Sequence, residues 1–544
     1  MTNSTTDKTL ITVLVLAGGD FEGKTLGPTP PLWSHPLLLP AGSKLAIEII
    51  RRFYSRGPLA SIFKVVIDTP PPKAVPIRSL DEKDVIRITP QANIVGSLRA
   101  SLEAVTTPWV LINPITTLPS RPAELATQIM IGERQLIRED WSSMKYDPNG
   151  SWTYEKKNET PTTIPTAPLT GIVCAPTKIL AELARDIQED QAGDLISIAK
   201  ALKEHTQTNI VETKWHDLGH RATHAISRRS NFSSREFNNV RYCAQRDVII
   251  KSSRDQIRLT YERNYLRALP QSLRRHFPAL ISSQREEESS LVMEAIPYPS
   301  LAELHLHWDL GPNIWLAILN RLKSIQSDFA NAAPTKIGSS SWLYSTKLKT
   351  RWEQFKASQL NNQWWQKDIN INGRWFSPLR QQVNELIKNL ADLERDSQLR
   401  LIHGDFCFNN ILCDPLYTSI RLIDPRGEAG PGDTAPTGYG DNRYDLVKLF
   451  HSIGGHYDSI VNNLFKVKCT DSNHLELEIY TPTHQRFLAK SFETILMPRE
   501  LSKRELNILT ASLFFSMLPL HSEDLDRQLA LAIRGMFLLS AQGA

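Results

Sequence analysis

Residues 401–412 read Leu-Ile-His-Gly-Asp-Phe-Cys-Phe-Asn-Asn-Ile-Leu, and residues 422–427 read Leu-Ile-Asp-Pro-Arg-Gly. Four residues separate Asp405 from Asn410, and Asp424 comes fourteen positions after Asn410. This spacing predicts a loop with Asp405 and Asn410 on one side of a tight turn, and a strand pair that brings Asp424 to the same place. The alternative, an ordinary turn with a nearby Asp, would require four fixed identities to coincide.

The two segments carry the groups that phosphoryl transfer needs. Transfer from a nucleotide requires a carboxylate that accepts the incoming hydroxyl proton, and oxygen ligands that hold magnesium on the phosphates. We therefore predict that Asp405 is the catalytic base, that Asn410 is a magnesium ligand and that Asp424 is the main magnesium ligand. His403 is expected to be structural and to fix the loop.

The same segments resemble the aminoglycoside phosphotransferase and choline kinase-like family, whose loop reads HGDxxxxNxL. Residues 440–449 are similar to the family's DPxYDLAKL helix start, and Asp445 is expected there to cap or anchor the catalytic loop. The resemblance covers about residues 223–544. It implies a bilobal protein-kinase-like α+β fold, with an N-lobe at about 223–297 and a C-lobe at about 298–544. The absence of H-R-D and A-P-E argues against a protein kinase.

The resemblance also implies a nucleotide site upstream of the loop. Lys251, in Val-Ile-Ile-Lys, looks like the strand lysine that contacts the α- and β-phosphates, and Glu262 on the next helix is its expected ion-pair partner. The segment Leu-Val-Met-Glu-Ala-Ile resembles the hinge that holds adenine, which assigns Glu294 and Ile296 to nucleotide binding. For a lysine taken alone, the alternative is a side chain that only extends along a strand to reach solvent.

One departure from the family pattern is the missing glycine-rich loop, since residues 228–240 contain no Gly. The resemblance makes Ser233, in a Ser/Asn-rich hairpin, the candidate phosphate cover. Between hinge and catalytic loop, aromatic and basic residues alternate over residues 342–375. They suit a sugar or amino-alcohol acceptor, or they are the packed core of a helical insert, which is the usual role of aromatic residues at helical spacing.

The first half shows alternating strands and helices. Strands are expected at 9–16, 62–68, 85–88 and 109–112, and helices at 45–54 and 96–105. This alternation predicts a mostly parallel sheet with crossover helices. In the second half, strands are expected at 247–251 and 290–294, and after residue 301 nearly all the chain is expected to be helical except at 401–440.

The start of the chain carries a second resemblance. Residues 13–19, Val-Leu-Val-Leu-Ala-Gly-Gly, end a strand in two glycines that let backbone N–H groups approach a phosphate or base. With His-Pro-Leu-Leu-Leu-Pro-Ala-Gly at 35–42, this resembles the sugar-phosphate nucleotidyltransferase opening LAAGxGxRL…PKPLLPVxGKP. The resemblance covers about residues 9–228. It implies a Rossmann-like, glycosyltransferase-A-type α/β fold, with Gly18 and Gly19 in nucleotide binding.

Its most specific piece is Trp-His-Asp-Leu-Gly at 215–219, close to the family's W-x-D-I-G, which makes Asp217 a candidate magnesium ligand. Three departures affect the chemistry. The activating Arg is absent, with Lys24 the nearest basic residue, and His35 stands where the family has Lys. Asn113 ends the strand that should end in a metal-binding Asp, and a neutral amide contributes little charge to a hard cation. The domain is expected to transfer nucleotides weakly, to bind a nucleotide sugar without chemistry, or to be a scaffold.

Length and composition limit the other possibilities. At a prior of about 150 residues per domain, 544 residues argue against a single domain, and we expect domains at 1–222 and 223–544. The net charge of 63 − 58 = +5 is too dilute to indicate nucleic acid or an anionic membrane as a main partner. The five cysteines are scattered, without a CxxC pair, and the start of the chain does not resemble a signal peptide. We expect a cytoplasmic protein that does not insert into membranes.

Together these observations predict an ATP- and Mg²⁺-dependent phosphotransferase that acts on a small hydroxyl acceptor, either a sugar, an amino-sugar or an amino-alcohol. It is fused to a degenerate nucleotidyltransferase domain, and the family resemblance suggests a place in surface (capsular) polysaccharide or glycan precursor synthesis. Two alternatives remain open. The chain is a bifunctional kinase and nucleotidyltransferase that makes a nucleotide-activated sugar, or it is a non-catalytic nucleotide-binding regulatory or assembly protein.

Overall fold

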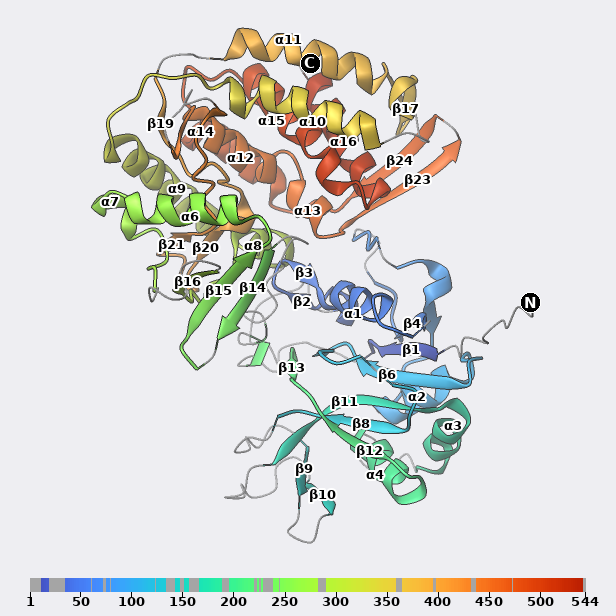
Figure 1. Ribbon diagram of the computed structural model, residues 1–544. Helices are drawn as coiled ribbons and strands as arrows, with labels where there is room; N and C mark the ends of the chain where they lie inside the picture. The colour runs from blue at the N-terminus through green and yellow to red at the C-terminus, as the bar shows by residue number, and fades with distance from the viewer. Residues whose placement is uncertain are drawn as a thin grey trace, which may run out of the picture. The chain divides into compact units, whose positions relative to one another are not determined.

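The computed structural model divides the chain into two compact units (Figure 1). Unit 1 comprises Met1–Lys73 and Ser79–Asn231, and unit 2 comprises Ala74–Arg78 and Phe232–Ala544. The structure describes residues 11–18, 35–59, 61–71, 75–78, 80–122, 124–133, 142–146, 151–155, 166–187, 195–219, 223–224, 227, 238–243, 245–281, 290–358, 364–394, 398–431, 437–471 and 473–541. The domain boundary expected at 222/223 stays a prediction.

A mostly parallel sheet forms the centre of unit 1. Strand β1 (Ile11–Leu16) pairs in parallel with β4 (Ser61–Ile67) on one side and β6 (Trp109–Pro114) on the other, and β4 pairs in parallel with β5 (Val85–Arg87). The order is β10-β9-β11-β6-β1-β4-β5, in which β11 (Ala167–Pro176) pairs antiparallel with β6. The other strands are β8 (Gln128–Ile131), β9 (Ser143–Tyr146), β10 (Trp152–Glu155) and β12 (Asn209–Glu212), with the short pairs β2 (Pro40–Ala41) with β3 (Lys44–Leu45) and β7 (Thr117–Leu118) with β13 (His216–Asp217).

Helices cover both faces of this sheet (Figure 1): α1 (Ala46–Ser55) lies on one face, and α2 (Ile94–Leu102), α3 (Thr177–Asp186) and α4 (Leu195–His205) lie on the other. All six residues of β1 are buried. Leu14 and Leu16 share a core with Leu98 of α2, Leu180 of α3 and Leu202 of α4. Strands buried on both faces read as continuous apolar runs, and the predicted α/β fold class of the first half is confirmed.

Unit 2 begins with a small antiparallel sheet of β14 (Asn238–Cys243), β15 (Val248–Ser253) and β16 (Ser290–Glu294), in that order. Helix α6 (Gln256–Ala268) follows β15, with the Asp255 side chain accepting a hydrogen bond from the N–H of Arg258 as its N-cap. A short helix, α7 (Gln271–Arg274), comes next. The two strands expected here are present, with bounds within two residues of the prediction, and the helix expected to carry Glu262 follows β15.

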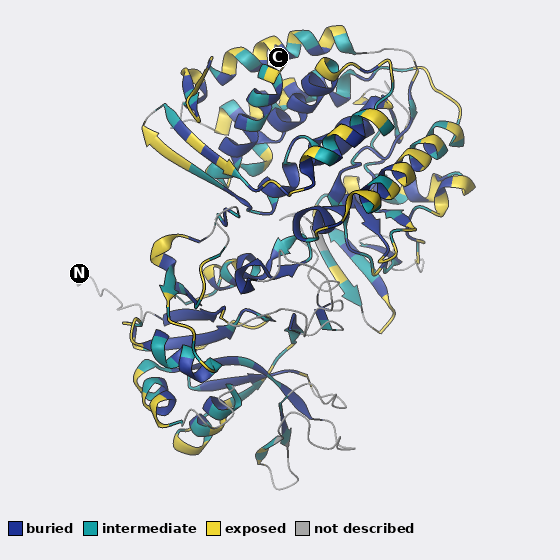
Figure 2. Ribbon diagram, turned by 180° about the vertical axis from the view of Figure 1, so that it is seen from behind, coloured by how far each residue is buried: buried dark blue, intermediate teal, exposed yellow. Residues whose placement is uncertain are grey.

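The larger part of unit 2 is helical. Its helices are α8 (Leu301–His307), α9 (Pro312–Ala332), α10 (Ser345–Ser358), α11 (Leu379–Leu393), α12 (Arg443–Ile453), α13 (Tyr457–Val461), α14 (Gln485–Ile495), α15 (Lys503–Ser516) and α16 (Leu525–Ser540). Figure 2 shows that their inward faces are buried and their outer faces exposed. The expected interruption near 401–440 contains the pairs β19 (Arg400–Leu401) with β22 (Tyr439–Gly440) and β20 (Ile411–Cys413) with β21 (Ile420–Leu422). A small sheet beside a helical lobe confirms the predicted α+β class.

One sheet contradicts the expectation of nearly continuous helix after residue 301. Strands β17 (Ile369–Ile371), β18 (Arg374–Phe376), β23 (Phe465–Asp471) and β24 (His474–Ile479) form a sheet in the order β18-β17-β24-β23. Its core-facing residues Ile371 and Phe465 are fully buried. Strands β17 and β18 have only three residues each, too few to show a period. Strands β23 and β24 do alternate apolar and polar residues, Phe-Lys-Val-Lys-Cys-Thr and Leu-Glu-Leu-Glu-Ile, a signal that the sequence analysis missed.

A short piece of the first half belongs to unit 2. The Arg78 N–H donates to the Asn463 carbonyl at 3.1 Å. Its guanidinium pairs with Asp524 and, at 3.3 Å, with Asp526, and lies 5.4 Å from the centre of the Phe465 ring. Unit 2 is therefore built from two separate stretches of the chain.

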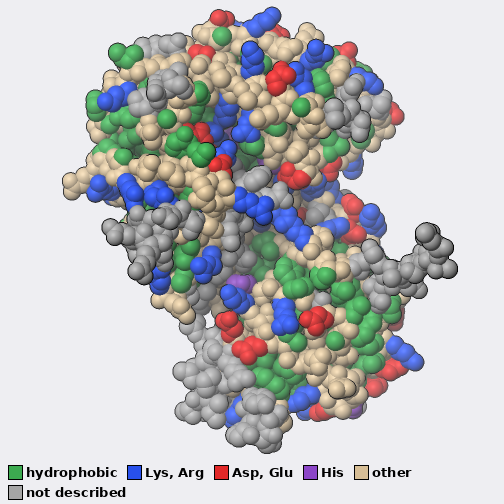
Figure 3. Space-filling view, viewed as in Figure 1, with side chains coloured by type: hydrophobic (Ala, Val, Ile, Leu, Met, Phe, Trp, Pro, Cys, Tyr) green, Lys and Arg blue, Asp and Glu red, His purple; other side chains and the backbone are tan. Residues whose placement is uncertain are grey.

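Charged side chains of both signs lie over the face of each unit that Figure 3 shows. No helix in the described part of the chain combines the length and the apolar character that crossing a bilayer requires.

Candidate functional site

Lys251 joins three elements of unit 2. From β15 its Nζ donates to Glu262 Oε2 on α6 at 2.6 Å and to Asp424 Oδ1, just after β21, at 2.8 Å. Burial alone would lower the pKa of Lys251, but the carboxylates of Asp424 and Glu262 raise it above its ordinary value. The predicted ion pair between Lys251 and Glu262 is present, and Asp424 completes it.

Glu262 is almost fully buried, at 5% exposed. Burial raises its pKa to about 7, against the opposing effect of the adjacent Lys251 ammonium. Its second oxygen, Oε1, has no hydrogen-bond partner within the described residues. The glutamate therefore depends on Lys251 for its charge, and removing that lysine would leave a buried carboxylate unpaired.

The β20–β21 hairpin explains the fourteen-residue spacing between Asn410 and Asp424. Ile411 pairs with Leu422 at the base of the hairpin, and the Ile423 N–H donates to the Asn410 carbonyl at 3.0 Å. Asn410 precedes one strand and Asp424 follows the other, so the two side chains leave the same end of the hairpin. Asp424 has a left-handed backbone, with φ of 57°, and its side chain is 47% exposed.

Asp405 lies in the loop before Asn410 and is held from two sides. The Asn410 amide donates to Asp405 Oδ2 at 3.0 Å, and the Lys448 ammonium lies 2.8 Å from Asp405 Oδ1. Burial would lower the pKa of Lys448, but Asp405 beside it raises it. Lys448, from α12, was missed in the sequence analysis. The sequence feature that could have identified Lys448 is its place within the otherwise apolar run Leu-Val-Lys-Leu-Phe.

The backbone of this loop is anchored by Asp445, whose two oxygens accept the N–H groups of His403 and Gly404, each at 2.8 Å. Burial raises the pKa of Asp445 to about 7. His403 is fully buried, stacks on the Phe277 ring at 5.8 Å and accepts the Asp405 N–H on Nδ1. The predicted anchoring by Asp445 and the structural role of His403 are confirmed.

Helix α6 is fixed against the same loop. The Tyr265 hydroxyl donates to the Ile402 carbonyl at 2.9 Å. Gly427 has φ of 60°, and a Cβ there would lie 2.5 Å from the Tyr261 carbonyl oxygen. Only glycine fits this approach. Glu262 on α6 therefore keeps its distance to the segment that carries Asp424.

The donor set of this site fits magnesium. Asn410 uses its amide nitrogen in hydrogen bonds, and within the described residues its oxygen accepts none. Asp424 binds Lys251 through one oxygen, which leaves the other for a cation. Magnesium typically takes one or two protein carboxylates, with waters and substrate phosphates completing its shell. No group of three His, Cys, Asp or Glu side chains suited to a metal occurs within the described residues, so phosphate oxygens would supply the remaining ligands.

The remaining residues of unit 2 predicted to bind the nucleotide are Glu294, Ile296 and Ser233. The Glu294 side chain pairs with Arg421 at 2.7 Å, and its N–H donates to the Ala279 carbonyl. These structural bonds leave only its own carbonyl as the backbone group that could contact adenine. Ile296 follows the strand and is 9% exposed. Ser233 lies outside the described residues.

In unit 1 the predicted metal site is occupied by hydrogen bonds. Asp217 accepts the Gly219 N–H at 2.9 Å and the Thr223 hydroxyl at 2.6 Å. Asn113 is fully buried, donates to the Pro114 and Thr117 carbonyls and accepts the Tyr54 hydroxyl. An amide with this set of partners is a structural group.

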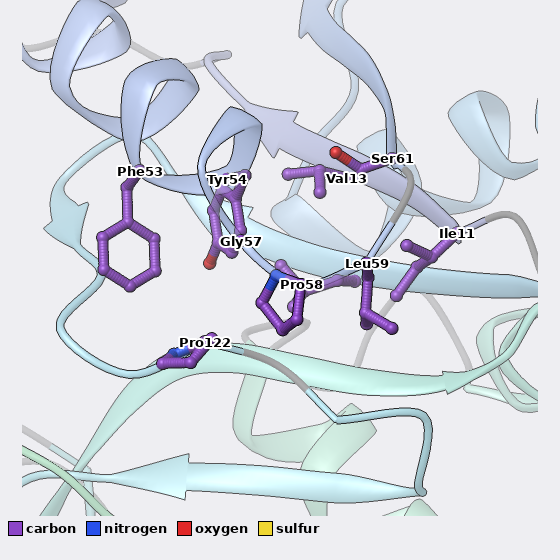
Figure 4. A pocket seen from close by; sticks show the side chains of 10 residues that line it. Ile11, Val13, Phe53, Tyr54, Gly57, Pro58, Leu59, Ser61 and Pro122 are labelled. Carbon is purple, nitrogen blue, oxygen red and sulfur yellow. The ribbon is translucent and has the colours of Figure 1, made fainter.

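The predicted nucleotide turn of unit 1 is only partly described. Gly18 is exposed after β1, and a Cβ there would lie 3.2 Å from Asp68 Oδ2. Gly19 and Lys24 lie outside the described residues. A small apolar pocket lies at the opposite end of β1, beside Ile11 and Val13, with Tyr54 from α1 (Figure 4). Ligands of open α/β sheets bind at the carboxyl ends of the strands, so this pocket is separate from the predicted turn.

The aromatic and basic segment divides into two groups. Tyr344, Trp352 and Trp365 are buried, and the Trp352 ring lies 5.6 Å from that of Trp365, so these aromatic residues belong to the core. Lys347 and Arg351, between them on α10, are partly buried and interact with Arg426, next to the catalytic loop. The packing interpretation holds for these aromatic residues.

No family model matches the chain, and no curated protein matches it. Solved structures show distant likenesses. The inositol-1-phosphate CTP transferase of T. maritima is 14% identical, with a TM-score of 0.29, over 40% of this chain and 91% of that one. The UDP-glucose pyrophosphorylase of Acinetobacter baumanii is 14% identical, with a TM-score of 0.27, over 40% and 92%.

A protein assigned as a fructosamine-3-kinase from Thermobifida fusca is 12% identical, with a TM-score of 0.33, over 54% of this chain and 85% of that one. Nucleotidyltransferases thus match the N-terminal part and a kinase matches the C-terminal part, which is how the two resemblances divide the sequence.

Proposed function

We propose that unit 2 transfers the γ-phosphoryl group of ATP to a hydroxyl group of a small acceptor. The observation that carries the proposal is the double contact of Lys251 with Glu262 and Asp424. This contact joins a strand, a helix and the carboxylate beside Asn410 in one charged arrangement. Phosphoryl transfer depends on positioning and on electrostatic stabilisation, and such an arrangement provides both.

In this reaction the acceptor oxygen forms a bond to the γ-phosphorus, and the bond from that phosphorus to the β–γ bridging oxygen breaks, so that ADP leaves. Asp405 takes the proton of the acceptor hydroxyl. Lys448 and Asn410 orient the Asp405 carboxylate, and Lys251 binds phosphate oxygens of the nucleotide. Magnesium, held by Asn410 and Asp424, would neutralise charge on the phosphates.

The test compares two substitutions in the full chain. Asp405→Asn should lower turnover by ~10² or more and leave Mg²⁺-ATP binding nearly unchanged, because the amide cannot take the proton. Asp424→Ala should instead weaken Mg²⁺-dependent nucleotide binding. Calorimetric titration with ATP and a radiolabel transfer assay over sugars, amino-sugars, choline and ethanolamine measure the two effects. Equal turnover in wild type and Asp405→Asn would exclude the kinase assignment.

For unit 1 we propose a nucleotide- or nucleotide-sugar-binding domain with weak or no transfer activity. The supporting observation is that Asn113 is buried and satisfied by hydrogen bonds where the related pattern has a metal-binding Asp. Little Mg²⁺-dependent pyrophosphate release is therefore expected from nucleoside triphosphates with sugar 1-phosphates. Robust release that disappears in Asp217→Ala would establish the bifunctional alternative.

The pairing of the two units supports a place in glycan precursor synthesis, because the product of a kinase, a phosphate ester, is the class of compound that nucleotidyltransferases activate. The non-catalytic alternative predicts that the chain binds Mg²⁺-ATP, if at all, without turnover on any acceptor. A complete Lys251, Glu262, Asp424 contact in unit 2 argues against that alternative.

A further inference from the structure

Four basic side chains gather around Tyr444, and three of them, Lys347, Arg426 and Lys448, also act on the carboxylate of Asp405. Lys347 and Arg351 come from α10, Arg426 comes from the segment after β21, and Lys448 comes from α12. All four are partly buried. Their charges therefore act over short distances in a place with little water, where electrostatic effects are strong.

The Tyr444 hydroxyl brings two of these cations together. It accepts a hydrogen bond from Lys347 Nζ at 2.8 Å and another from Arg426 Nη1 at 3.2 Å. Taken together, these distances hold the two nitrogen atoms no more than about 6 Å apart. Two like charges at this separation repel each other unless a negative group lies between them.

The described residues supply too few negative groups. Arg426 Nε donates to Glu428 Oε2 at 2.8 Å, and Lys448 pairs with Asp405. Lys347 and Arg351 have no carboxylate within ion-pair distance in the described part of the chain. Asp445, a third carboxylate near Lys448, accepts the N–H groups of His403 and Gly404. Burial, together with the positive charges of Arg426 and Lys448, lowers the pKa of Lys347 well below its ordinary value.

We propose that the acceptor of unit 2 is an anion: a small hydroxyl compound that also carries a phosphate or carboxylate group, bound by Lys347 and Arg351 while its hydroxyl group faces Asp405. The inference rests on the proposed phosphoryl transfer at Asp405. Phosphate and carboxylate both offer charged oxygens that suit a guanidinium group and an ammonium group. A cationic amino-sugar or amino-alcohol would instead bring a further positive charge beside the Arg351 and Arg426 guanidinium groups.

Binding without nucleotide tests the cluster directly. The full chain is titrated calorimetrically with inorganic phosphate. It is then titrated with glucose 6-phosphate, glucuronate, glucose and glucosamine, which have the same pyranose ring and differ in the charge of one substituent. We expect phosphate to bind and to bind at least tenfold more weakly to Lys347→Met and to Arg351→Gln. Lys349→Met, an exposed lysine on the same helix, is the matched control and should bind phosphate as the wild type does.

The arms of the titration distinguish the two anionic groups. Tighter binding of glucose 6-phosphate than of glucuronate identifies a phosphate group, and the reverse identifies a carboxylate. Tighter binding of glucosamine than of both anions overturns the inference. Equal phosphate binding by the wild type, Lys347→Met and Arg351→Gln also overturns it.

Kinetics separate this inference from the proposed function. With an anionic acceptor, Lys347→Met should raise KM for the acceptor at least tenfold and leave KM for ATP unchanged. A rise in KM for ATP alone would assign the cations to the donor phosphates and overturn the inference. Phosphorylation of neutral acceptors, unaffected by Lys347→Met, would overturn the inference and leave the proposed kinase function standing. Loss of turnover in Asp405→Asn with phosphate binding intact supports both.

Discussion

Lys448 and Asp405 form the contact that most directly controls the proposed base. The ammonium lies 2.8 Å from one carboxylate oxygen, while Asn410 holds the other. A base fixed from both sides keeps its position when the acceptor arrives, which is the kind of preorganisation that contributes to rate. Lys448 is thus a positioning residue whose effect can be measured separately from that of Asp405.

We predict that Lys448→Met lowers kcat by about 10-fold or more while KM for ATP changes little, because the contact orients the base and does not touch the donor. Lys448→Arg keeps the charge and should recover part of the rate. Steady-state kinetics measure both variants, with Lys349→Met as the control. Equal losses in Lys448→Met and Lys448→Arg, with kcat and both KM values affected alike, would indicate a purely structural role.

A second residue-scale prediction concerns the buried pair His305 and His484, whose Nδ1 and Nε2 atoms lie 3.0 Å apart. Burial lowers the pKa of His484 to about 4, against about 6.5 in an unfolded chain. Between about pH 6.5 and 4, His484 is protonated in the unfolded state but not in the folded state. The free energy of unfolding therefore falls as the pH decreases through this range.

Between pH 7 and pH 5, His484 should cost the wild type about 2 kcal/mol of unfolding free energy. His484→Gln keeps a hydrogen-bonding side chain without this titration, so its stability should fall by about that much less over the same range. Urea unfolding at both pH values gives the difference. The same loss in wild type and variant would show that His484 does not carry the effect.

At this scale the sequence predicted the residues that stand at fixed positions in a motif. Asp405, Asn410 and Asp424 were proposed from their spacing, and the structure places Asp405 and Asn410 in one loop and Asp424 at the end of the following hairpin. Lys448 was not assigned, because a lysine within a helix usually marks a solvated face, and Lys347 was only one of the basic residues of the 342–375 segment, for which an acceptor site and a packed core both stayed open. Only the packing of α10 and α12 beside the loop turns these two lysines inward.

At the scale of elements, the β17–β18 hairpin had a usable local signal. Asn372-Gly373 joins two three-residue strands, and both residues have positive φ, 51° and 83°, as an Asn-Gly hairpin turn requires. The Asn372 side chain also bonds both the N–H and the carbonyl of Leu477 on β24. That pairing spans more than a hundred residues, and no periodicity in the sequence could reveal it.

We predict that Gly373→Ala destabilises unit 2 by about 1–2 kcal/mol through its left-handed backbone alone, since no atom lies within 4 Å of a Cβ built there. Gly311→Ala is the matched control. It has equal space around it, but its φ of −63° suits any residue. Thermal unfolding compares the two, and equal shifts in the midpoint would show that the backbone conformation at Gly373 is not the cause.

At the scale of the molecule, alternation of strands and helices was sufficient to predict the class of unit 1, because its sheet is buried and reads as continuous apolar segments. The division of the chain was harder to predict. Residues 75–78 lie between two strands of unit 1 in the sequence, yet Arg78 contacts Asn463, Asp524 and Phe465 in unit 2. A single boundary position cannot describe a domain that also includes this separate segment of the first half.

We predict that Arg78→Ala lowers the unfolding free energy of unit 2 by about 1–2 kcal/mol, because it leaves Asp524 partly buried with a weaker partner, Arg527 at 3.5 Å. Arg87→Ala, which removes an exposed pair with Glu82, should change stability by less than about 0.5 kcal/mol. A fragment 223–544 should fold and show the same deficit as Arg78→Ala. An unchanged unit 2 transition in that variant would contradict this account.

The Arg78–Asp524 pair also has a consequence for biosynthesis. The two residues are 446 positions apart, so at about 5–20 residues per second the ribosome releases Arg78 roughly 20 to 90 s before its partner exists. Through most of translation, Arg78 is therefore a cation on the nascent chain whose ion-pair partner Asp524 has not yet been synthesised. If elongation stops before residue 524, Arg78 stays without Asp524, and chaperones that bind nascent chains would contact this part of the chain while it is unpaired.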